Sequence, residues 1–371
     1  MTAAAPFEIF LAALPGLEPL LAEEARAAGF ASPAAVPGGV TVTGGWPEVW
    51  RANLVLRGAS RVLVRIGAFR AFHLAQLDKR ARKVDWAAVL RPDRPVRVEV
   101  QCRASKIYHA RAAAQRIERA IAETLGAPIG GEEAIALKVR IDDNLVTLSL
   151  DSSGEPLHRR GHKQAVGKAP LRETMAALFL RACDFDGQEP VLDPMCGSGT
   201  FPIEAAEIAA GLAPGRDRSF AFEDFASFNA EAWASMKAPA PPIPAEARFF
   251  GSDRDDGAIR MATANAARAG VADRTDFRRQ AVSDLIRPEG PAGLVMVNPP
   301  YGARIGDRKL LFALYGALGA TLRDRFAGWR VGLVTSDEGL ARATALPFLP
   351  PAPPVAHGGL KVRLFRTAPL P

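Results

Sequence analysis

The segment VLDPMCGSGTFPIEAA, residues 191–206, decides the fold of the C-terminal half of this chain. It reads as an apolar strand, a turn of small residues and the start of a helix. Gly197 and Gly199 let the turn backbone approach a ligand closely, and the N–H groups at the helix start suit an anionic or polar ligand. Pro202 falls in the first helical turn, where its missing N–H costs nothing. The segment therefore predicts a ligand-binding turn between a strand and a helix.

Two nucleotide-binding motifs do not fit this turn. The third glycine of the dinucleotide fingerprint would fall on Pro202, and the phosphate-binding loop would need a lysine that is absent. A plain tight turn without a ligand remains the structural alternative.

The same strand-then-helix pattern repeats further along the chain. ARFFGSD (247–253) precedes one amphipathic helix, and GLVMVNPP (293–300) precedes another. Repeated units of this kind indicate a parallel sheet with helices on both faces. The sequence thus predicts a Rossmann-like α/β domain.

Asp253 stands at the end of the second of these strands. An acidic side chain there can accept hydrogen bonds from both hydroxyls of an adenosine ribose. The alternative is a helix N-cap, a role that Asp255 or Asp256 could fill instead.

The third strand ends in Asn298, Pro299, Pro300 and Tyr301. An exocyclic amino group of a base is a poor nucleophile, because its lone pair is delocalised into the ring. The side-chain carbonyl of Asn298 and the backbone carbonyl of Pro299 can each accept one of its hydrogens, while two prolines stiffen the turn and Tyr301 can stack on an extruded base. Since Asn takes up no proton at neutral pH, the rate must come from alignment and electrostatics. The alternative is a Pro-Pro turn whose tyrosine only packs.

Bulk properties narrow the class of protein. A chain of 371 residues with 48% hydrophobic and 23% charged residues fits two or three globular domains. No apolar stretch approaches the ~20 residues that span a bilayer, and no signal peptide is recognisable, so we expect no membrane partner and a cytoplasmic location. Three well-separated cysteines and five histidines form no metal-binding motif, so no metal is expected.

Residues 1–155 read as small α+β units, with helices packed on sheets. The net charge of +7 is concentrated there, because residues 51–120 hold 17 Lys/Arg against five Asp/Glu. Such a segment predicts a surface for a polyanion; a solvated basic surface is the equal alternative.

Taken together, DPMCGSGT, Asp253 and NPPY resemble class I S-adenosylmethionine-dependent methyltransferases that modify amino groups. The resemblance implies catalytic roles for Asn298, Pro299 and Tyr301. It implies S-adenosylmethionine contacts from Thr174, Asp193, Pro194, Met195, Cys196, Gly197, Ser198, Gly199, Thr200, Asp253, Asp284 and Asn298. After the strand that comes between Asp253 and Asn298 in the sequence, the family usually has an acidic residue near the adenine, whereas this chain has Gln280-Ala281 and reaches Asp284 only later.

The front half resembles the bacterial THUMP-containing RNA guanine-N2 methyltransferases, in particular the rRNA large-subunit methyltransferase L group. LPGLEPLLAEE, RANLVLRGASRVLVRIGAF and LDSSGEPLHRRGHKQAVGKAPLRETMAAL carry this likeness. It implies a ferredoxin-like segment (1–60), a THUMP RNA-binding domain (61–155) and a class I methyltransferase domain (156–371).

Two local features allow a second interpretation. Cys196 could be a nucleophile of the kind that 5-methylpyrimidine enzymes use, but its place in the cofactor turn favours a small packing residue. LHRRGHK (157–163) could guide RNA phosphate toward the pocket or be a solvated linker.

We therefore expect an RNA methyltransferase that acts on the N2 of a guanosine, with 23S rRNA as the first substrate and structured RNA as the partner. The alternatives are the same chemistry on tRNA, a DNA adenine or cytosine amino-methyltransferase, and a non-catalytic RNA-binding factor. The sequence names neither the modified nucleotide nor an oligomeric state.

Overall fold

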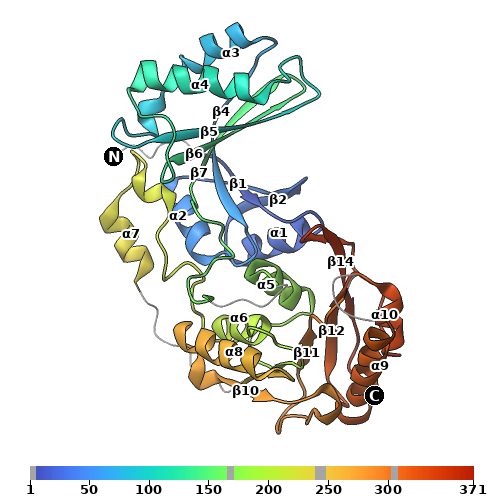
Figure 1. Cartoon of the computed structure of the whole chain (residues 1–371). Helices are drawn as coiled ribbons and strands as arrows, with labels where there is room; N and C mark the ends of the chain where they lie inside the picture. The colour runs from blue at the N-terminus through green and yellow to red at the C-terminus, as the bar shows by residue number, and fades with distance from the viewer. Residues whose placement is uncertain (1–5, 165–170, 239–247, 302–307) are drawn as a thin grey trace. The chain divides into compact units, whose positions relative to one another are not determined.

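A computed structural model describes residues 6–164, 171–238, 248–301 and 308–371. The chain divides into two compact units (Figure 1). Unit 1 comprises Met1–Ala13, Ala22–Leu157 and Arg218–Ala238, and unit 2 comprises Leu14–Leu21, His158–Asp217 and Pro239–Pro371. The segment Arg218–Ala238 lies within the predicted methyltransferase range yet groups with unit 1, so the units are not consecutive stretches of sequence.

Unit 1 is built on one seven-stranded sheet in the order β2-β3-β1-β4-β7-β6-β5. Only β5 and β6 pair in parallel, because α4 crosses between them; the other neighbours are antiparallel. The strands are β1 (Phe7–Ala12), β2 (Ala31–Val36), β3 (Gly39–Gly44), β4 (Arg61–Arg70), β5 (Val96–Arg103), β6 (Ile135–Asp142) and β7 (Leu145–Asp151). Its helices are α1 (Glu18–Ala27, shared at its start with unit 2), α2 (Trp46–Val55), α3 (Leu74–Ala81), α4 (Ala110–Leu125) and α7 (Ala230–Lys237).

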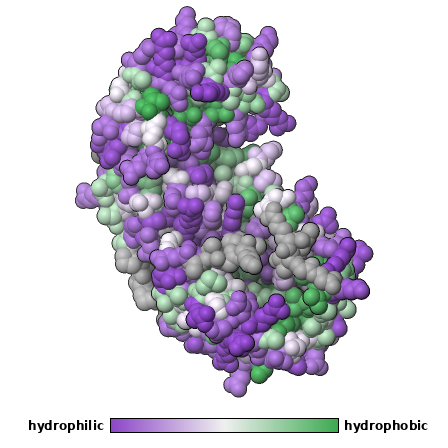
Figure 2. All heavy atoms as spheres, in the orientation of Figure 1, coloured by the Kyte–Doolittle hydropathy of each residue, from purple (hydrophilic) through white to green (hydrophobic). Residues whose placement is uncertain are grey.

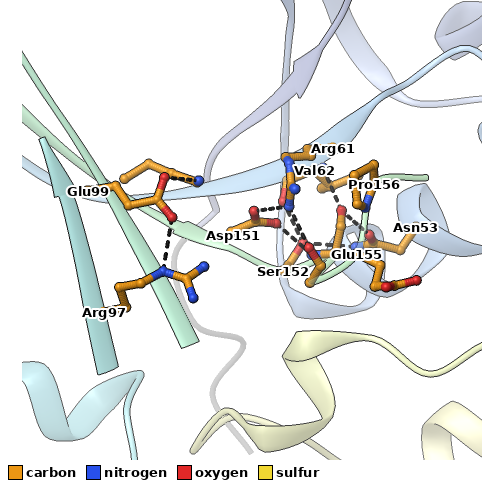
Figure 3. A network of polar contacts seen from close by, with 12 residues as sticks. Asn53, Arg61, Val62, Arg97, Glu99, Asp151, Ser152, Glu155 and Pro156 are labelled. Carbon is orange, nitrogen blue, oxygen red and sulfur yellow. Dashed lines mark hydrogen bonds and ion pairs between the residues drawn. The ribbon is translucent and has the colours of Figure 1, made fainter. Parts of the chain in front are cut away.

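A buried polar network joins α2, β4 and the end of β7 (Figure 3). Asn53 is 1% exposed; its amide donates to the Val49 carbonyl (2.9 Å) and to Ser152 Oγ (2.9 Å), while Ser153 Oγ donates to its carbonyl oxygen (2.7 Å). Beside it Arg61 pairs with Asp151, whose carboxylate is almost completely buried. Burial raises the pKa of Asp151, and the Arg61 charge opposes that rise. Each polar side chain named here has a partner, and these contacts hold α2, β4 and the end of β7 together.

Unit 2 carries the second seven-stranded sheet, in the order β10-β9-β8-β11-β12-β14-β13. The first five strands are parallel to one another, β14 pairs antiparallel with β12, and β13 pairs antiparallel with β14. The strands are β8 (Val191–Asp193), β9 (Phe249–Asp253), β10 (Thr275–Arg279), β11 (Leu294–Val297), β12 (Arg330–Thr335), β13 (Val355–His357) and β14 (Leu360–Arg366). The helices are α5 (Glu173–Ala182), α6 (Thr200–Ala209), α8 (Asp256–Arg268), α9 (Arg308–Arg325) and α10 (Glu338–Ala343). The predicted alternation of strands and helices is confirmed.

Two apolar clusters cover the two faces of this sheet. Side chains of β11 alternate between them: Leu294 and Met296 join the cluster of α5, α6 and α8, whereas Val295 and Val297 join that of α9 and α10. Because both faces are covered, β11 is fully buried, as its uninterrupted apolar sequence indicates. The strand order reverses beside β8, and open α/β sheets bind ligands at such a point, beyond the carboxyl ends of the strands.

Candidate active site

The turn between β8 and α6 is fixed against the end of β9. Gly199 precedes the helix with φ +84°, a conformation that favours glycine, and a Cβ there would lie 3.0 Å from the Cβ of Ala262. The Cys196 N–H donates to the Ser252 carbonyl (2.9 Å), and the Gly197 N–H donates to Asp253 Oδ2 (3.1 Å). The glycines thus serve close packing as well as ligand approach.

Asp253 is left available for a ligand because a different residue caps the following helix. Asp255 is the N-cap of α8, and its Oδ1 accepts the Gly257 N–H at 2.8 Å. The Asp253 carboxylate accepts the backbone N–H of Gly197 and, at 2.9 Å, that of Asp255. Its side chain also lines a cavity. The alternative interpretation of Asp253 as a helix cap is therefore wrong.

A cavity of about 530 Å³ lies at the carboxyl ends of β8, β9, β10 and β11. Its size suits a nucleoside-sized ligand. The described residues that line it are Pro194, Met195, Asp253, Arg254, Asp255, Gln280, Ala281, Val282, Ser283, Asn298, Pro300, Leu314 and Ala317.

Asn298 follows β11 directly and contributes an unusual atom to this cavity. Its Oδ1 is buried and accepts no hydrogen bond within the described part of the chain. The neighbouring Pro300 carbonyl is occupied, since it accepts from the Tyr315 hydroxyl (3.3 Å), which also contacts Thr335 Oγ1 (3.3 Å). A buried acceptor without a donor is costly, and this oxygen is available to a hydrogen-bond donor from a ligand in the cavity.

Tyr301 is partly buried and packs against both core clusters of unit 2. Burial raises the pKa of its hydroxyl to about 12, so the phenol stays neutral at physiological pH. An uncharged ring anchored in this way is suited to stacking.

Burial also controls the ionisable groups of the turn. It raises the pKa of Asp193 to about 8, although the Met195 N–H donates to its Oδ1 (3.0 Å), and the charge of Asp253 adds to the rise. Burial likewise raises the pKa of Cys196 well above its ordinary value. Cys196 therefore stays a thiol, which supports its interpretation as a packing residue rather than a nucleophile.

The structure brings only some of the expected cofactor residues to the cavity wall. Pro194, Met195, Asp253 and Asn298 line it. Asp284 is exposed and is not among the described lining residues, although the preceding residues 280–283 are. Thr174 is 2% exposed in the first turn of α5 and likewise does not line the described wall.

Sequence reasoning did not find the contribution of α9. Leu314 and Ala317 line the cavity from this helix. Their spacing of three residues puts them on one helical face, which is a signal, but an apolar helical face more often indicates core.

Two of the three Lys and Arg side chains of the segment 157–163 are buried, whereas Arg159 is exposed. Arg160 pairs with Glu204 (3.3 Å), Lys163 pairs with Glu173 (3.0 Å), and His162 Nδ1 lies 3.8 Å from Glu207, with its pKa lowered by burial. Arg160 and Lys163 are at most a tenth exposed, so these two cations are not available to RNA phosphate. Lys163 Nζ also donates to Thr200 Oγ1 (2.9 Å) and so holds the start of α6.

The described residues contain no group of three His, Cys, Asp or Glu side chains arranged as a metal site. Across the same segments, no helix is both long and apolar enough to cross a membrane.

Comparisons with known proteins agree with this geometry. Residues 160–347 match the model of the RMKL-like methyltransferase domain, and residues 8–63 match that of the RlmL ferredoxin-like domain. The chain is 34% identical over 362 residues to the ribosomal RNA large subunit methyltransferase K/L of Chromohalobacter salexigens; the match covers 92% of this chain and 50% of that protein. The chain thus spans about half the length of this curated relative.

Solved structures match over both units. A predicted N6-adenine-specific DNA methylase from Listeria monocytogenes is 30% identical with a TM-score of 0.86, covering 97% of this chain and 96% of that one. SMU.472, named as a methyltransferase and solved with S-adenosylhomocysteine, has a TM-score of 0.86 at 24% identity, covering 100% of both chains. The second match shows a shared fold.

Proposed function

The chain belongs to the family of RMKL-like methyltransferase domains, and from this premise we propose that it methylates RNA. The methyl group of S-adenosylmethionine would pass to the exocyclic N2 of a guanosine, with 23S rRNA as the first substrate to test. The observation that carries the proposal is the buried Oδ1 of Asn298 on the wall of the cavity, for which the described segments offer no hydrogen-bond donor.

The residues of the cavity fit S-adenosylmethionine. Asp253 offers a carboxylate at the end of β9, where such a group can accept from ribose hydroxyls. Pro194 and Met195 supply apolar surface, and Ala281 and Val282 provide small and apolar neighbours for an adenine ring. Bound there, the cofactor would supply an electrophilic methyl group.

Asn298 and Pro299 would orient the amino group of the substrate. The described structure assigns no donor to the Pro299 carbonyl or to Asn298 Oδ1, so both oxygens can each accept one hydrogen of an amine. Accepting those hydrogens directs the nitrogen lone pair away from the two oxygens and raises its electron density. Neither oxygen takes up the proton, which would leave to water after transfer.

Tyr301 would stack on the face of the substrate base. Its neutral ring, packed on both apolar clusters, can stack on a base taken out of its helix. The hydroxyl of Tyr315 fixes the Pro300 carbonyl and thereby stiffens the turn that carries these groups.

RNA as the substrate class is supported by the curated relative, whose name specifies large-subunit ribosomal RNA. The ferredoxin-like match over residues 8–63 supports the same assignment, because its model is that of an RNA methyltransferase L group. A THUMP domain over residues 61–155 remains part of the proposal, as does the three-part division of the chain.

The test is a transfer assay with labelled cofactor. The purified protein is incubated with tritiated S-adenosylmethionine and total RNA from a strain that lacks its gene, and the RNA is then fractionated and digested to nucleosides. Label in N2-methylguanosine from large-subunit rRNA supports the proposal. Label in tRNA keeps the chemistry and changes the substrate.

DNA is tested in parallel because the Listeria relative is named a predicted DNA adenine methylase. Unmethylated duplex DNA replaces RNA in the same assay. Label in DNA and none in RNA would overturn the proposal, and no label in either would indicate a protein that kept the pocket without the reaction.

A further inference from the structure

Three loops of unit 1 meet at one end of its sheet. They are residues 70–73 at the end of β4, residues 103–111 from the end of β5 to the start of α4, and the turn 143–144 between β6 and β7. We call these residues together the end-loop surface. Asn144 connects all three: its carbonyl accepts the Ala71 N–H (2.9 Å), its Oδ1 accepts the Lys106 N–H (2.9 Å), and its own N–H donates to Ser105 Oγ (2.9 Å). These bonds fix the loops relative to one another.

The hairpin turn gives this junction a defined shape. Asp143 and Asn144 have φ of +45° and +60°, as a two-residue hairpin turn of the tight, twisted kind requires. Asn and Asp tolerate this conformation better than other residues with a side chain. The surface is therefore preformed.

Aromatic rings stand out of this surface. Tyr108 is 78% exposed, while Ile107 beside it is 4% exposed and anchors the loop in the core. The His109 ring lies 5.4 Å from the Tyr108 ring. Phe72 is 41% exposed, and the Lys106 ammonium lies 5.6 Å from its ring centre. Exposing large rings to water is unfavourable, so a cluster of them marks a place where something binds.

Positive charge surrounds the rings. Arg103, Lys106 and Arg111 are exposed, and within the described residues none of them forms an ion pair. Arg70 reaches Asp143 at only 3.8 Å, and Asp142 is paired with Arg140. Elsewhere in this unit, Arg82 and Arg119 both pair with Glu123. In Figure 2 hydrophilic side chains cover most of the visible face, with small hydrophobic groups among them.

We propose that the end-loop surface binds an unpaired stretch of RNA, with one base stacked on Tyr108 and phosphates held by Lys106, Arg103 and Arg111. The proposal rests on the proposed function, because it takes RNA as the substrate. An unpaired strand fits better than a duplex, since a protruding ring can reach the face of a base only where the bases are not already stacked on each other.

Binding is measured with the full chain and without cofactor. Fluorescence anisotropy compares a labelled single-stranded RNA of about 12 nucleotides with a duplex of the same sequence at fixed salt. We expect Tyr108→Ala to weaken single-strand binding about tenfold, because stacking on one ring is worth about 1–3 kcal/mol per base. Tyr108→Phe keeps the ring and should bind as the wild type does.

The charge is tested separately. Lys106→Gln should weaken binding about threefold and lower the salt dependence by about one phosphate contact. Lys361→Gln is the matched control, because it removes an exposed lysine from β14 of unit 2 and should leave binding unchanged.

Photo-crosslinking locates the contact. An oligonucleotide with 5-iodouridine is irradiated with the protein and digested with trypsin, which cuts after Lys106 and Arg111. A crosslinked peptide 107–111, lost in Tyr108→Ala, would support the surface. Equal binding by Tyr108→Ala and wild type, tighter binding of the duplex, or no binding of RNA at all would overturn it.

The two proposals fail separately. Methyl transfer to RNA with no effect of Tyr108→Ala on binding would remove the surface and keep the function. RNA binding that depends on Tyr108, in a protein that methylates only DNA, would keep the surface and remove the proposed function.

Discussion

Two asparagines of this chain lie in opposite situations. Asn53, in the network of unit 1, uses its amide and its carbonyl in three hydrogen bonds and is 1% exposed. Asn298, directly after β11 in unit 2, has a buried carbonyl oxygen that accepts no hydrogen bond from any residue described. The same side chain is thus satisfied in one region and unsatisfied in the other.

This difference distinguishes a side chain that stabilises the fold from one that is available to a ligand. A satisfied buried amide contributes to stability and costs several hydrogen bonds when removed. An unsatisfied one lowers stability, and binding of a ligand that donates to it removes that cost. Substituting the two residues should therefore have opposite consequences.

The largest effect is expected from Asn298→Ala. Removing one of the two acceptors should lower kcat for RNA methylation about 10³-fold, the size of effect seen when one preorganised polar group of an active site is lost. Cofactor affinity, measured by isothermal titration, should change less than about threefold, because Asp253 and the turn remain.

Asn298→Asp is the control for this prediction. It keeps an acceptor oxygen at the same position and should retain more activity than the alanine variant. Equal losses of cofactor binding and turnover in Asn298→Ala would show that Asn298 belongs to the cofactor site alone.

Asn53→Ala should act on stability. We expect the free energy of unfolding to fall by about 3 kcal/mol, because both serine hydroxyls of the network lose a partner in a buried place. Urea denaturation measures the loss. Asn229→Ala is the matched control: it removes an exposed N-cap of α7 and should cost only about 1 kcal/mol. A similar small loss for both variants would contradict the role of the buried network.

Asp193→Asn extends the comparison to a buried acid. Its pKa is about 8 in the folded protein, while the unfolded chain loses the same proton near pH 4, so ionisation favours unfolding and wild-type stability falls as pH rises between these values. Asparagine has no proton to lose. The variant should therefore be more stable than wild type at pH 8 and equally stable at pH 4. Thermal unfolding across this range tests it, and a pH-independent difference would contradict it.

Asn265→Ala should have the smallest effect. This fully buried residue donates to the Ser198 carbonyl (3.0 Å) and accepts from Arg268, so it supports the cofactor turn from α8. Its loss should weaken cofactor binding about fivefold, the equivalent of one hydrogen bond of about 1 kcal/mol. Unchanged affinity in isothermal titration would show that the glycine turn keeps its shape without this support.

Much of the fold could be predicted because the spacing of apolar residues along the sequence indicates which side chains are buried. The apolar run 294–297 and the glycine turn at 197–199 identified a Rossmann-like domain, and both the methyltransferase and the ferredoxin-like assignments are confirmed. Local patterns carry no information about long-range pairing, however. The grouping of Arg218–Ala238 with unit 1 depends on aromatic contacts between distant segments, such as Trp50 with Phe222.

The site could be predicted in part. The sequence identified Asp253 and Asn298, because residues at strand ends share one edge of a parallel sheet. It could not tell which cations of residues 157–163 are buried, since a run of cations looks the same whether a side chain is exposed, as Arg159 is, or lies against the buried glutamates of α6. The partners Glu204 and Glu207 are separated from it by about forty residues of sequence. The roles assigned to the single site residues remain predictions.

The discontinuous path of unit 1 has a consequence for its biosynthesis. Phe222 and Trp233 pack ring to ring (5.0 Å), and Phe222 stacks near Trp50, so they complete the aromatic core beneath α2. When a ribosome has made the first 157 residues, this core still lacks its last layer. Strand β8 and helix α6 are synthesised before that layer emerges, so unit 1 must wait, incomplete, while the cofactor turn of unit 2 is already out of the exit tunnel.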